Sequence, residues 1–297
     1  WIAGAGKGMP LYHAITGEHI YTAGSEGLDF KGMHDYARST GGRVLRKMSF
    51  HERARIIKAL ALFLNEKKKD LYAISAATGA TKGDSWIDID GGIGNLFVYA
   101  SKGRRELPDE TFLVDGQLEK ISKNGTFAGH HICVPLEGVA VHINAFNFPV
   151  WGMLEKIAVN FLAGMPAIVK PASATSYLTE AAVRQIVESG ILPEGALQLI
   201  CGSAGDLLDH LDCQDVVTFT GSAETGKMLK RHPSIVEHSI RFNMEADSLN
   251  CSILGPDAEP GTEEFNLFVR ELSREITIKA GQKCTAIRRA IVPKHLT

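Results

Sequence analysis

The chain has 297 residues and a mass of 32.2 kDa, and 44% of its residues are hydrophobic, which is enough to fill more than one domain. The net charge of −2 excludes a broad basic surface for nucleic acid or an anionic membrane, and no apolar run approaches the roughly 20 residues that span a bilayer. The five cysteines show no paired spacing and no Cys/His cluster occurs, so we expect a cytoplasmic protein without disulfides and without a bound metal.

Residues 1–27 are rich in glycine and turn-forming residues. The GAGKG segment at 4–8 has no strand before it and no helix after it, so we predict a surface hairpin here rather than a nucleotide-binding loop. Because the first residue is Trp1 and not Met, we expect the sequence as given to lack a preceding segment.

Two helices are expected next. From Ser49 onward apolar residues recur every three or four positions, and Ser49 with Glu52 forms a capping-box pattern that predicts the start of a helix. The segment 88–100 contains a Gly-Gly pair, and we predict a helix whose small residues allow a neighbouring element to approach closely.

The second half of the chain has an α/β rhythm. Residues 119–143 alternate in polarity and turn at Asn124–Gly125 and again at 135–138, which predicts a hairpin. Short apolar runs at 166–171, 196–202 and 215–221 then alternate with helical segments at 179–189, near 206–210 and after Ser222. This alternation predicts the α/β class, with a doubly wound, Rossmann-like parallel sheet that binds a ligand at the carboxyl ends of its strands.

The stretch VVTFTGSAETGKM (216–228) differs by one residue from the phosphate-binding loop of P-loop nucleotide hydrolases. In those loops a Ser or Thr follows the lysine and binds magnesium, whereas Met228 is a thioether with little affinity for a hard cation. A glycine turn at a helix N-terminus still presents N–H groups to an anion such as a dinucleotide pyrophosphate. A P-loop-like nucleotide hydrolase therefore remains the less favoured alternative.

Four further stretches carry chemically active residues. They are INAFNFPVW (143–151), VKPAS (169–173), NMEADSLN (243–250) and AGQKCTAIRR (280–289). In this order, with the glycine turn at 221–226 between the second and the third, they resemble the aldehyde dehydrogenase superfamily over essentially the whole chain. The longer stretches HINAFNFPVWGMLEK and KAGQKCTAIRR resemble one subfamily, the dehydrogenases that oxidise a ring-opened CoA semialdehyde in phenylacetate degradation, with those of benzoate degradation as the alternative.

The resemblance implies that Cys284 is the catalytic nucleophile, Glu245 the general base, and Asn147 an oxyanion donor together with the backbone N–H of Cys284. An aldehyde must become tetrahedral before it can release a hydride, and a thiolate achieves this by adding to the carbonyl carbon. A thiol with a pKa of about 8.5 is mostly protonated at neutral pH, so we expect the site to activate Cys284. The thioester that follows needs a base to activate water, a role that suits Glu245.

The resemblance also implies a nicotinamide cofactor. Lys170 is expected at the adenosine ribose or its phosphate, Gly221 and Ser222 at the pyrophosphate, and Gly226 at a point of close packing. Many members of the family have a glutamate where this chain has Ser173. A small neutral side chain leaves room for a 2′-phosphate and removes a repulsive charge, so we predict NADP as the cofactor, with NAD as the alternative.

The resemblance further implies a dinucleotide-binding domain at 1–118 and 144–245, an oligomerisation hairpin at 119–143, and the start of a second α/β catalytic domain at 246–297. We expect a homodimer or a higher oligomer that acts on a small, CoA-linked aldehyde. Because the chain ends at Thr297, we expect the remainder of the catalytic domain to be absent and the given residues alone to be poorly soluble and inactive. An inactive Rossmann scaffold is the remaining alternative.

Overall fold

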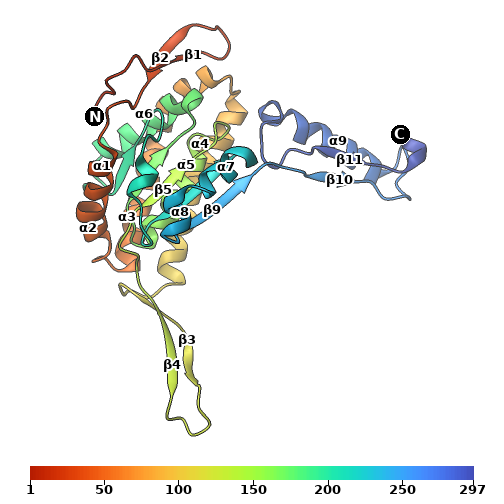
Figure 1. Ribbon diagram of the computed structural model, residues 1–297. Coiled ribbons are helices and arrows are strands. Elements are labelled where there is room, and N and C mark those ends of the chain that lie inside the picture. The colour runs from red at the N-terminus through yellow and green to blue at the C-terminus, as the bar shows by residue number, and fades with distance from the viewer.

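A five-stranded parallel sheet forms the centre of the protein, which a computed structural model describes over residues 1–297 (Figure 1). The strands lie in the order β7-β6-β5-β8-β9. They comprise β5 Ala140–Ile143, β6 Ala167–Lys170, β7 Leu197–Leu199, β8 Val216–Gly221 and β9 Arg241–Ala246. From β5 the chain builds one side of the sheet and then returns to build the other, so the strand order reverses between β5 and β8. Open α/β sheets bind ligands at such a reversal, outside the carboxyl ends of the strands.

Helices cover both faces of this sheet (Figure 1). They are α1 Phe30–Tyr36, α2 Arg43–Leu45, α3 Phe50–Ser75, α4 Lys82–Arg105, α5 Trp151–Leu162, α6 Ser176–Glu188, α7 Ala223–Lys230 and α8 Pro233–Glu237. Neighbouring residues of β6 divide between two apolar cores, because successive strand residues point to opposite faces. Ala167 and Val169 join the core under α3 to α6, and Ile168 joins the core that includes Phe30 and Ile235. The predicted doubly wound α/β fold is confirmed.

Two local features predicted for the first half of the chain are present in the structure. The N–H of Glu52 donates to Ser49 Oγ at 3.2 Å and the N–H of Ser49 donates to the Glu52 carboxylate at 2.8 Å, which is the predicted capping box at the start of α3. In α4, a methyl group added to Gly92 would lie 2.9 Å from the backbone of Trp151. The prediction that small residues allow close packing in this helix is therefore confirmed.

Two antiparallel hairpins lie outside the sheet. Strands β1 Met9–Tyr12 and β2 His19–Ala23 form the hairpin predicted for residues 1–27. Strands β3 Leu113–Lys120 and β4 Ala128–Cys133 form an arm that projects from the body (Figure 1). The expected hairpin bounds of 119–143 need correction, since the arm starts earlier and ends at Cys133. Residues 140–143 are instead β5, the central strand of the sheet, whose residues are all buried and whose Val141 and Ile143 join the core that includes Phe30 and Ile235.

Beyond β9 the chain forms a β-α-β unit that extends away from the sheet (Figure 1). It consists of β10 Cys251–Ile253, α9 Glu263–Thr277 and β11 Arg289–Ile291, with β10 and β11 paired in parallel. None of the residues of α9 is buried. None of the helices combines the length and the apolar character that a membrane-spanning helix needs.

Candidate active site

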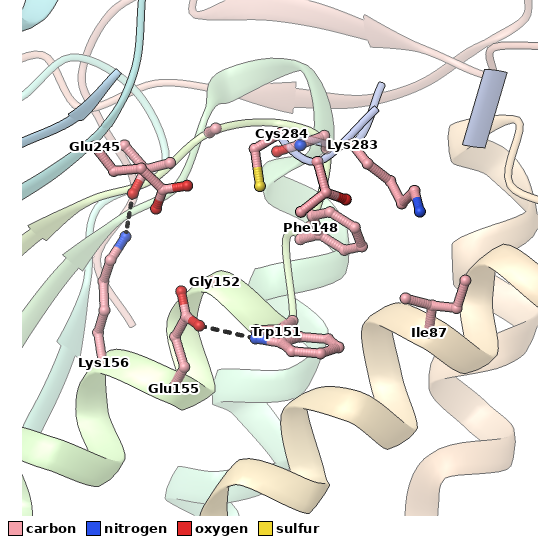
Figure 2. A pocket seen from close by; sticks show the side chains of 13 residues that line it. Ile87, Phe148, Trp151, Gly152, Glu155, Lys156, Glu245, Lys283 and Cys284 are labelled. Atoms are coloured by element: carbon pink, nitrogen blue, oxygen red, sulfur yellow. Dashed lines mark hydrogen bonds between the residues drawn. The ribbon is translucent and has the colours of Figure 1, made fainter. Parts of the chain in front are cut away.

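Three residues from distant parts of the sequence line one cavity. Asn147 lies in the turn between β5 and α5, Glu245 lies in β9, and Cys284 lies in the loop after α9. All three face a cavity of about 370 Å³, into which the sulfur of Cys284 points (Figure 2). The cavity lies at the carboxyl ends of β5, β8 and β9, where the strand reversal predicts a ligand site.

The loop that carries Cys284 is held against the N-F-P turn. The side-chain amide of Asn147 donates to the carbonyl oxygen of Gln282 at 2.7 Å. Just before this contact the backbone is left-handed at Lys279, Ala280 and Gly281, with φ values of 51°, 50° and 71°. For the two residues with a Cβ this conformation costs about 1 kcal/mol or more each. Strain of this kind persists where the surrounding structure fixes it, and here it aims the loop at the cavity.

A second amide holds the loop from its other side. Asn250, directly before β10, donates from Nδ2 to the carbonyl oxygen of Cys284 at 2.5 Å and to that of Ala286 at 3.3 Å. Both backbone carbonyls are thereby satisfied by one side chain from the NMEADSLN stretch. The position of Cys284 therefore depends on two asparagines that lie over one hundred residues apart.

The surroundings of Cys284, Glu245 among them, favour its protonated thiol. Partial burial of the sulfur, the negative charge of Glu245 and a hydrogen bond from the thiol to that carboxylate raise the pKa of Cys284 above its ordinary value. The N–H groups of Cys284 and Thr285 counter this in part. The activation expected from the sequence is thus not a lowered thiol pKa. The geometry instead provides a proton acceptor next to a protonated thiol.

The cavity contains charged residues that the sequence did not single out. Lys156, in α5, donates to Asn144 Oδ1 at 2.6 Å and to Thr220 Oγ1 at 2.8 Å. Burial lowers the pKa of Lys156 to about 8, against the opposing effect of the carboxylates of Glu155 and Glu245. A sequence feature could have identified these charged residues, namely their place in the helix that follows the N-F-P turn. The first turns of this helix line the cavity.

Four of the five residues expected to hold a cofactor line a second cavity of about 920 Å³. Its walls include Lys170, Ser173, Gly221 and Ser222. It shares six lining residues with the first cavity, namely Ala145, Asn147, Thr220, Glu245, Lys283 and Cys284. The two cavities therefore meet at the thiol and approach it from different sides.

The second cavity extends to the start of a helix. Ser222 is the N-cap of α7 and its Oγ accepts a hydrogen bond from the N–H of Thr225 at 3.2 Å, so the helix begins at the cavity wall. The start of a helix carries partial positive charge and favours a phosphate group. Lys170 donates to the carbonyl of Pro171 at 3.1 Å, and burial lowers its pKa.

Gly226 has a different place from the other expected cofactor residues. It does not line the cavity but is buried inside α7, where an added methyl group would collide with the side chains of Met244 and Phe219. The helix can lie this close to β8 and β9 only because the position is glycine.

Comparison with known proteins adds to this geometry. The sequence profile of the aldehyde dehydrogenase family matches residues 1–297. The 3,4-dehydroadipyl-CoA semialdehyde dehydrogenase of Aromatoleum evansii is 47% identical over 294 residues, covering 99% of this chain and 57% of that protein. The N-succinylglutamate 5-semialdehyde dehydrogenase of Escherichia coli K12 is 27% identical, covering 98% of this chain and 56% of that protein.

Solved structures share the fold at low identity. Betaine aldehyde dehydrogenase from Staphylococcus aureus in complex with NAD+ has a TM-score of 0.84 at 22% identity, covering 100% of this chain and 56% of that one. Succinic semialdehyde dehydrogenase from Streptococcus pyogenes in complex with NADP+ has a TM-score of 0.81 at 19% identity, covering 97% of this chain and 60% of that one. The chain thus spans little more than half the length of the relatives it matches. Since the family profile extends over every residue and a relative at nearly half identity aligns with almost the whole chain, the chain belongs to the aldehyde dehydrogenase family.

Proposed function

We propose that this protein oxidises an aldehyde to a carboxylic acid with a nicotinamide dinucleotide, through a covalent intermediate on Cys284. The observation that carries the proposal is the meeting of two cavities at one thiol. The smaller cavity offers space for the aldehyde, and the larger one ends at the helix start of α7 and at Ser173. When bound in the larger cavity, the dinucleotide supplies the hydride acceptor.

In the first step Cys284 adds to the aldehyde carbon. Glu245 takes the thiol proton, because the raised pKa of the thiol means that a base must remove it. The oxyanion that forms is stabilised by the amide of Asn147 and by the backbone N–H of Cys284. Asn147 has two amide hydrogens and uses one toward Gln282. Loss of one oxyanion donor costs about a hundredfold to a thousandfold in rate in comparable sites.

The second half of the reaction is hydrolysis. Once hydride has left, Cys284 carries a thioester, and water must attack its carbonyl. After Glu245 has passed the thiol's proton to solvent, it acts as the general base for that water. The products are the carboxylic acid and the free thiol.

We propose NADP as the preferred cofactor. Ser173 lies in the wall of the second cavity and also in that of a neighbouring cavity beside the N-terminal hairpin, so there is room around a neutral side chain. The test is the specificity constant, kcat/KM, measured with NADP and with NAD. We expect a higher value for NADP, and a reversal of the preference in Ser173→Glu. A higher value for NAD in the wild-type protein contradicts the proposal.

We propose a CoA-linked semialdehyde as the substrate. The support is the 47% identity with a dehydrogenase whose name specifies a CoA semialdehyde. The identity with that relative supports the alternative in benzoate degradation. The resemblance of the stretches around Asn147 and Cys284 supports the substrate of phenylacetate degradation. Assaying the full-length protein against CoA semialdehydes of different chain length and unsaturation decides between them.

We propose that the β3-β4 arm docks onto a second copy of the chain. The arm exposes apolar side chains along its length, among them Leu118, Phe127 and Ile132. Exposed apolar surface of this kind on an open two-stranded hairpin favours association. Light scattering is expected to give at least a dimer for the wild type and a smaller particle for the double variant Leu118→Asp, Ile132→Asp.

The reactivity of the Cys284 thiol distinguishes an enzyme from an inactive scaffold. For the enzyme, we expect alkylation of Cys284 to slow in the presence of an aldehyde and to change when NADP is added. The readout is mass spectrometry of the Cys284 peptide. If neither compound changes the rate of alkylation and no aldehyde is oxidised, the result supports the scaffold instead.

A further inference from the structure

Glu155 is a carboxylate in the wall of the aldehyde cavity. It lies in α5, one turn after Trp151, so both side chains are on the same face of the helix. The indole Nε1 of Trp151 donates to Glu155 Oε2 at 2.8 Å. Both residues line the cavity of about 370 Å³ that also contains Cys284 (Figure 2). The indole therefore fixes the carboxylate in the cavity wall.

The charge of Glu155 has no ion-pair partner. Lys156, the next residue, directs its ammonium group to Asn144 and Thr220. Lys283, the other lysine of the cavity, forms an ion pair with Glu275 at 2.6 Å. Burial raises the pKa of Glu155 above its ordinary value and the charge of Glu245 adds to this effect, while the hydrogen bond from Trp151 and the charge of Lys156 counter it in part.

The space beside this carboxylate is open. Gly152 lies between Trp151 and Glu155 and also lines the cavity. A methyl group added to Gly152 would meet no atom within 4 Å. A substrate chain that extends from Cys284 along this wall can therefore pass close to Glu155.

We propose that Glu155 makes this cavity select aldehydes whose far end is uncharged over those that end in a free carboxylate. The inference rests on the proposed aldehyde oxidation and specifies its substrate class: a semialdehyde whose acid group is masked as a thioester, an ester or an amide. Two like charges in a half-buried cavity repel each other much more than in water. For charges about 6 Å apart this corresponds to about a tenfold to hundredfold loss of kcat/KM. A short semialdehyde with a free acid brings its carboxylate within such a distance, whereas a CoA thioester places a neutral acyl group there.

The test compares two substrates that differ only in this charge, adipic semialdehyde and its methyl ester. For the full-length wild-type protein we expect kcat/KM to be at least about tenfold higher for the ester. In Glu155→Gln we expect the ratio to fall to about threefold or less, because the charge that repels the free acid is gone. Glu188→Gln, at the exposed end of α6, is the matched control and is expected to keep the wild-type ratio. Equal use of both substrates by the wild type, or an unchanged ratio in Glu155→Gln, overturns the inference.

A second measurement separates this inference from the proposed function. If the wild type oxidises neither compound, the proposed function fails, and protection of Cys284 against alkylation then decides the inference without turnover. Protection by the ester but not by the free acid supports it, and equal protection by both overturns it. If Glu155→Gln does not fold, Glu155→Met, which keeps the length of the side chain and removes its charge, takes its place in both measurements.

Discussion

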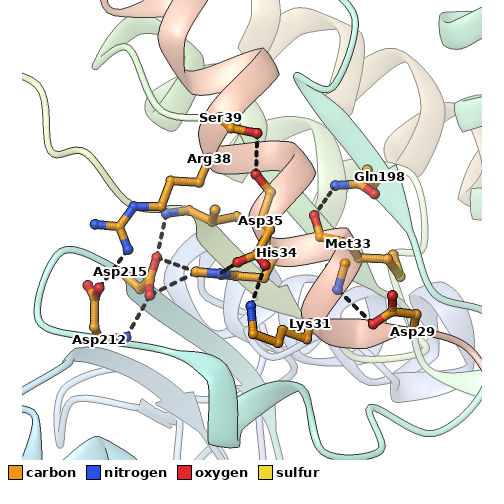
Figure 3. Close-up of polar contacts among 12 residues, drawn as sticks. Asp29, Lys31, Met33, His34, Asp35, Arg38, Ser39, Gln198, Asp212 and Asp215 are labelled. Carbon is orange, nitrogen blue, oxygen red and sulfur yellow. Dashed lines mark hydrogen bonds and ion pairs between the residues drawn. The ribbon is translucent and has the colours of Figure 1, made fainter.

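The imidazole of His34 in α1 lies with Nε2 3.1 Å from both carboxylate oxygens of Asp215, a residue directly before β8 (Figure 3). Both side chains are buried. The carboxylate also accepts hydrogen bonds from the N–H of Val139 at 2.6 Å and from that of Asp212 at 2.7 Å. One buried carboxylate therefore joins α1 to the starts of β5 and β8, at the opposite end of these strands from the active site.

Replacing His34 by leucine is expected to destabilise the fold. The substitution leaves the buried Asp215 carboxylate without its cationic or imidazole partner, which costs about 3 kcal/mol of unfolding free energy. Lys31→Met in the same helix removes only the exposed ion pair with Asp35 and is expected to leave the unfolding midpoint unchanged. Urea denaturation followed by circular dichroism measures both. Equal midpoints for the two variants contradict the assigned role.

The same pair gives the stability a defined pH dependence. Burial lowers the pKa of His34, but the hydrogen bond and charge of Asp215, with a contribution from Asp35, outweigh it and raise the pKa above the ordinary value of 6.5. The stabilisation is therefore fully present below about pH 6.5 and is lost as the pH rises through the folded-state pKa. We expect the difference in unfolding free energy between the wild type and His34→Leu to be larger at pH 6 than at pH 9. Burial lowers the pKa of His142 to about 4, so this residue affects the pH dependence of stability in the opposite sense. Because the wild type and His34→Leu both contain His142, its effect cancels in the difference between them.

Asp247 lies at the start of α7, in the wall of the second cavity where we propose that the dinucleotide binds. Its Oδ1 accepts a hydrogen bond from the N–H of Ala223 in the first turn of α7, at 3.1 Å, and its own backbone is left-handed with φ 58°. A carboxylate at a helix start is stabilising but repels a second anion. Asp247→Asn keeps the capping oxygen and tolerates the positive φ. We expect it to tighten dinucleotide binding about threefold to tenfold in a fluorescence titration, with Asp257→Asn unchanged. Weaker binding in Asp247→Asn would show that the carboxylate supports the cofactor instead.

Local signals in the sequence predicted much of the fold. The capping box at Ser49, the Gly-Gly pair in α4 and the glycine turn after β8 each depend on a few neighbouring residues, and each holds. The bounds of the β3-β4 arm were wrong because alternation alone does not show which partner a strand pairs with. Residues 140–143 continue the alternating pattern but pair with β6 and β8.

Contacts between distant residues could not be predicted from local patterns. His34 and Asp215 are 181 residues apart, and neither belongs to a recognisable motif. Glu155 and Lys156 follow the N-F-P turn, but only the packing of α5 shows that one faces open space while the other is satisfied by Asn144. The raised pKa of Cys284 likewise depends on its burial and on the approach of a carboxylate from β9.

This approach of Glu245 to Cys284 leads to opposite expectations for two measurements on one variant. In Glu245→Gln the negative charge that helps to raise the thiol pKa is gone, so the pKa falls and the thiolate fraction at neutral pH grows. We therefore expect iodoacetamide to alkylate Cys284 faster in the variant than in the wild type at pH 7.5. Aldehyde oxidation is expected to fall by about a hundredfold or more, because the base for the thiol and for water is lost.

Peptide mass spectrometry distinguishes this site from the other exposed cysteines, and Cys133 on the β3-β4 arm serves as the internal control whose alkylation rate stays constant. The sign of the change at Cys284 separates two physical roles for Glu245. If its charge acts mainly by raising the thiol pKa in the resting protein, alkylation accelerates; if it acts already as a base toward any electrophile, alkylation slows. Slower alkylation would therefore refute the view that the resting thiol is held protonated by its carboxylate neighbour, while the loss of oxidation alone would fit both.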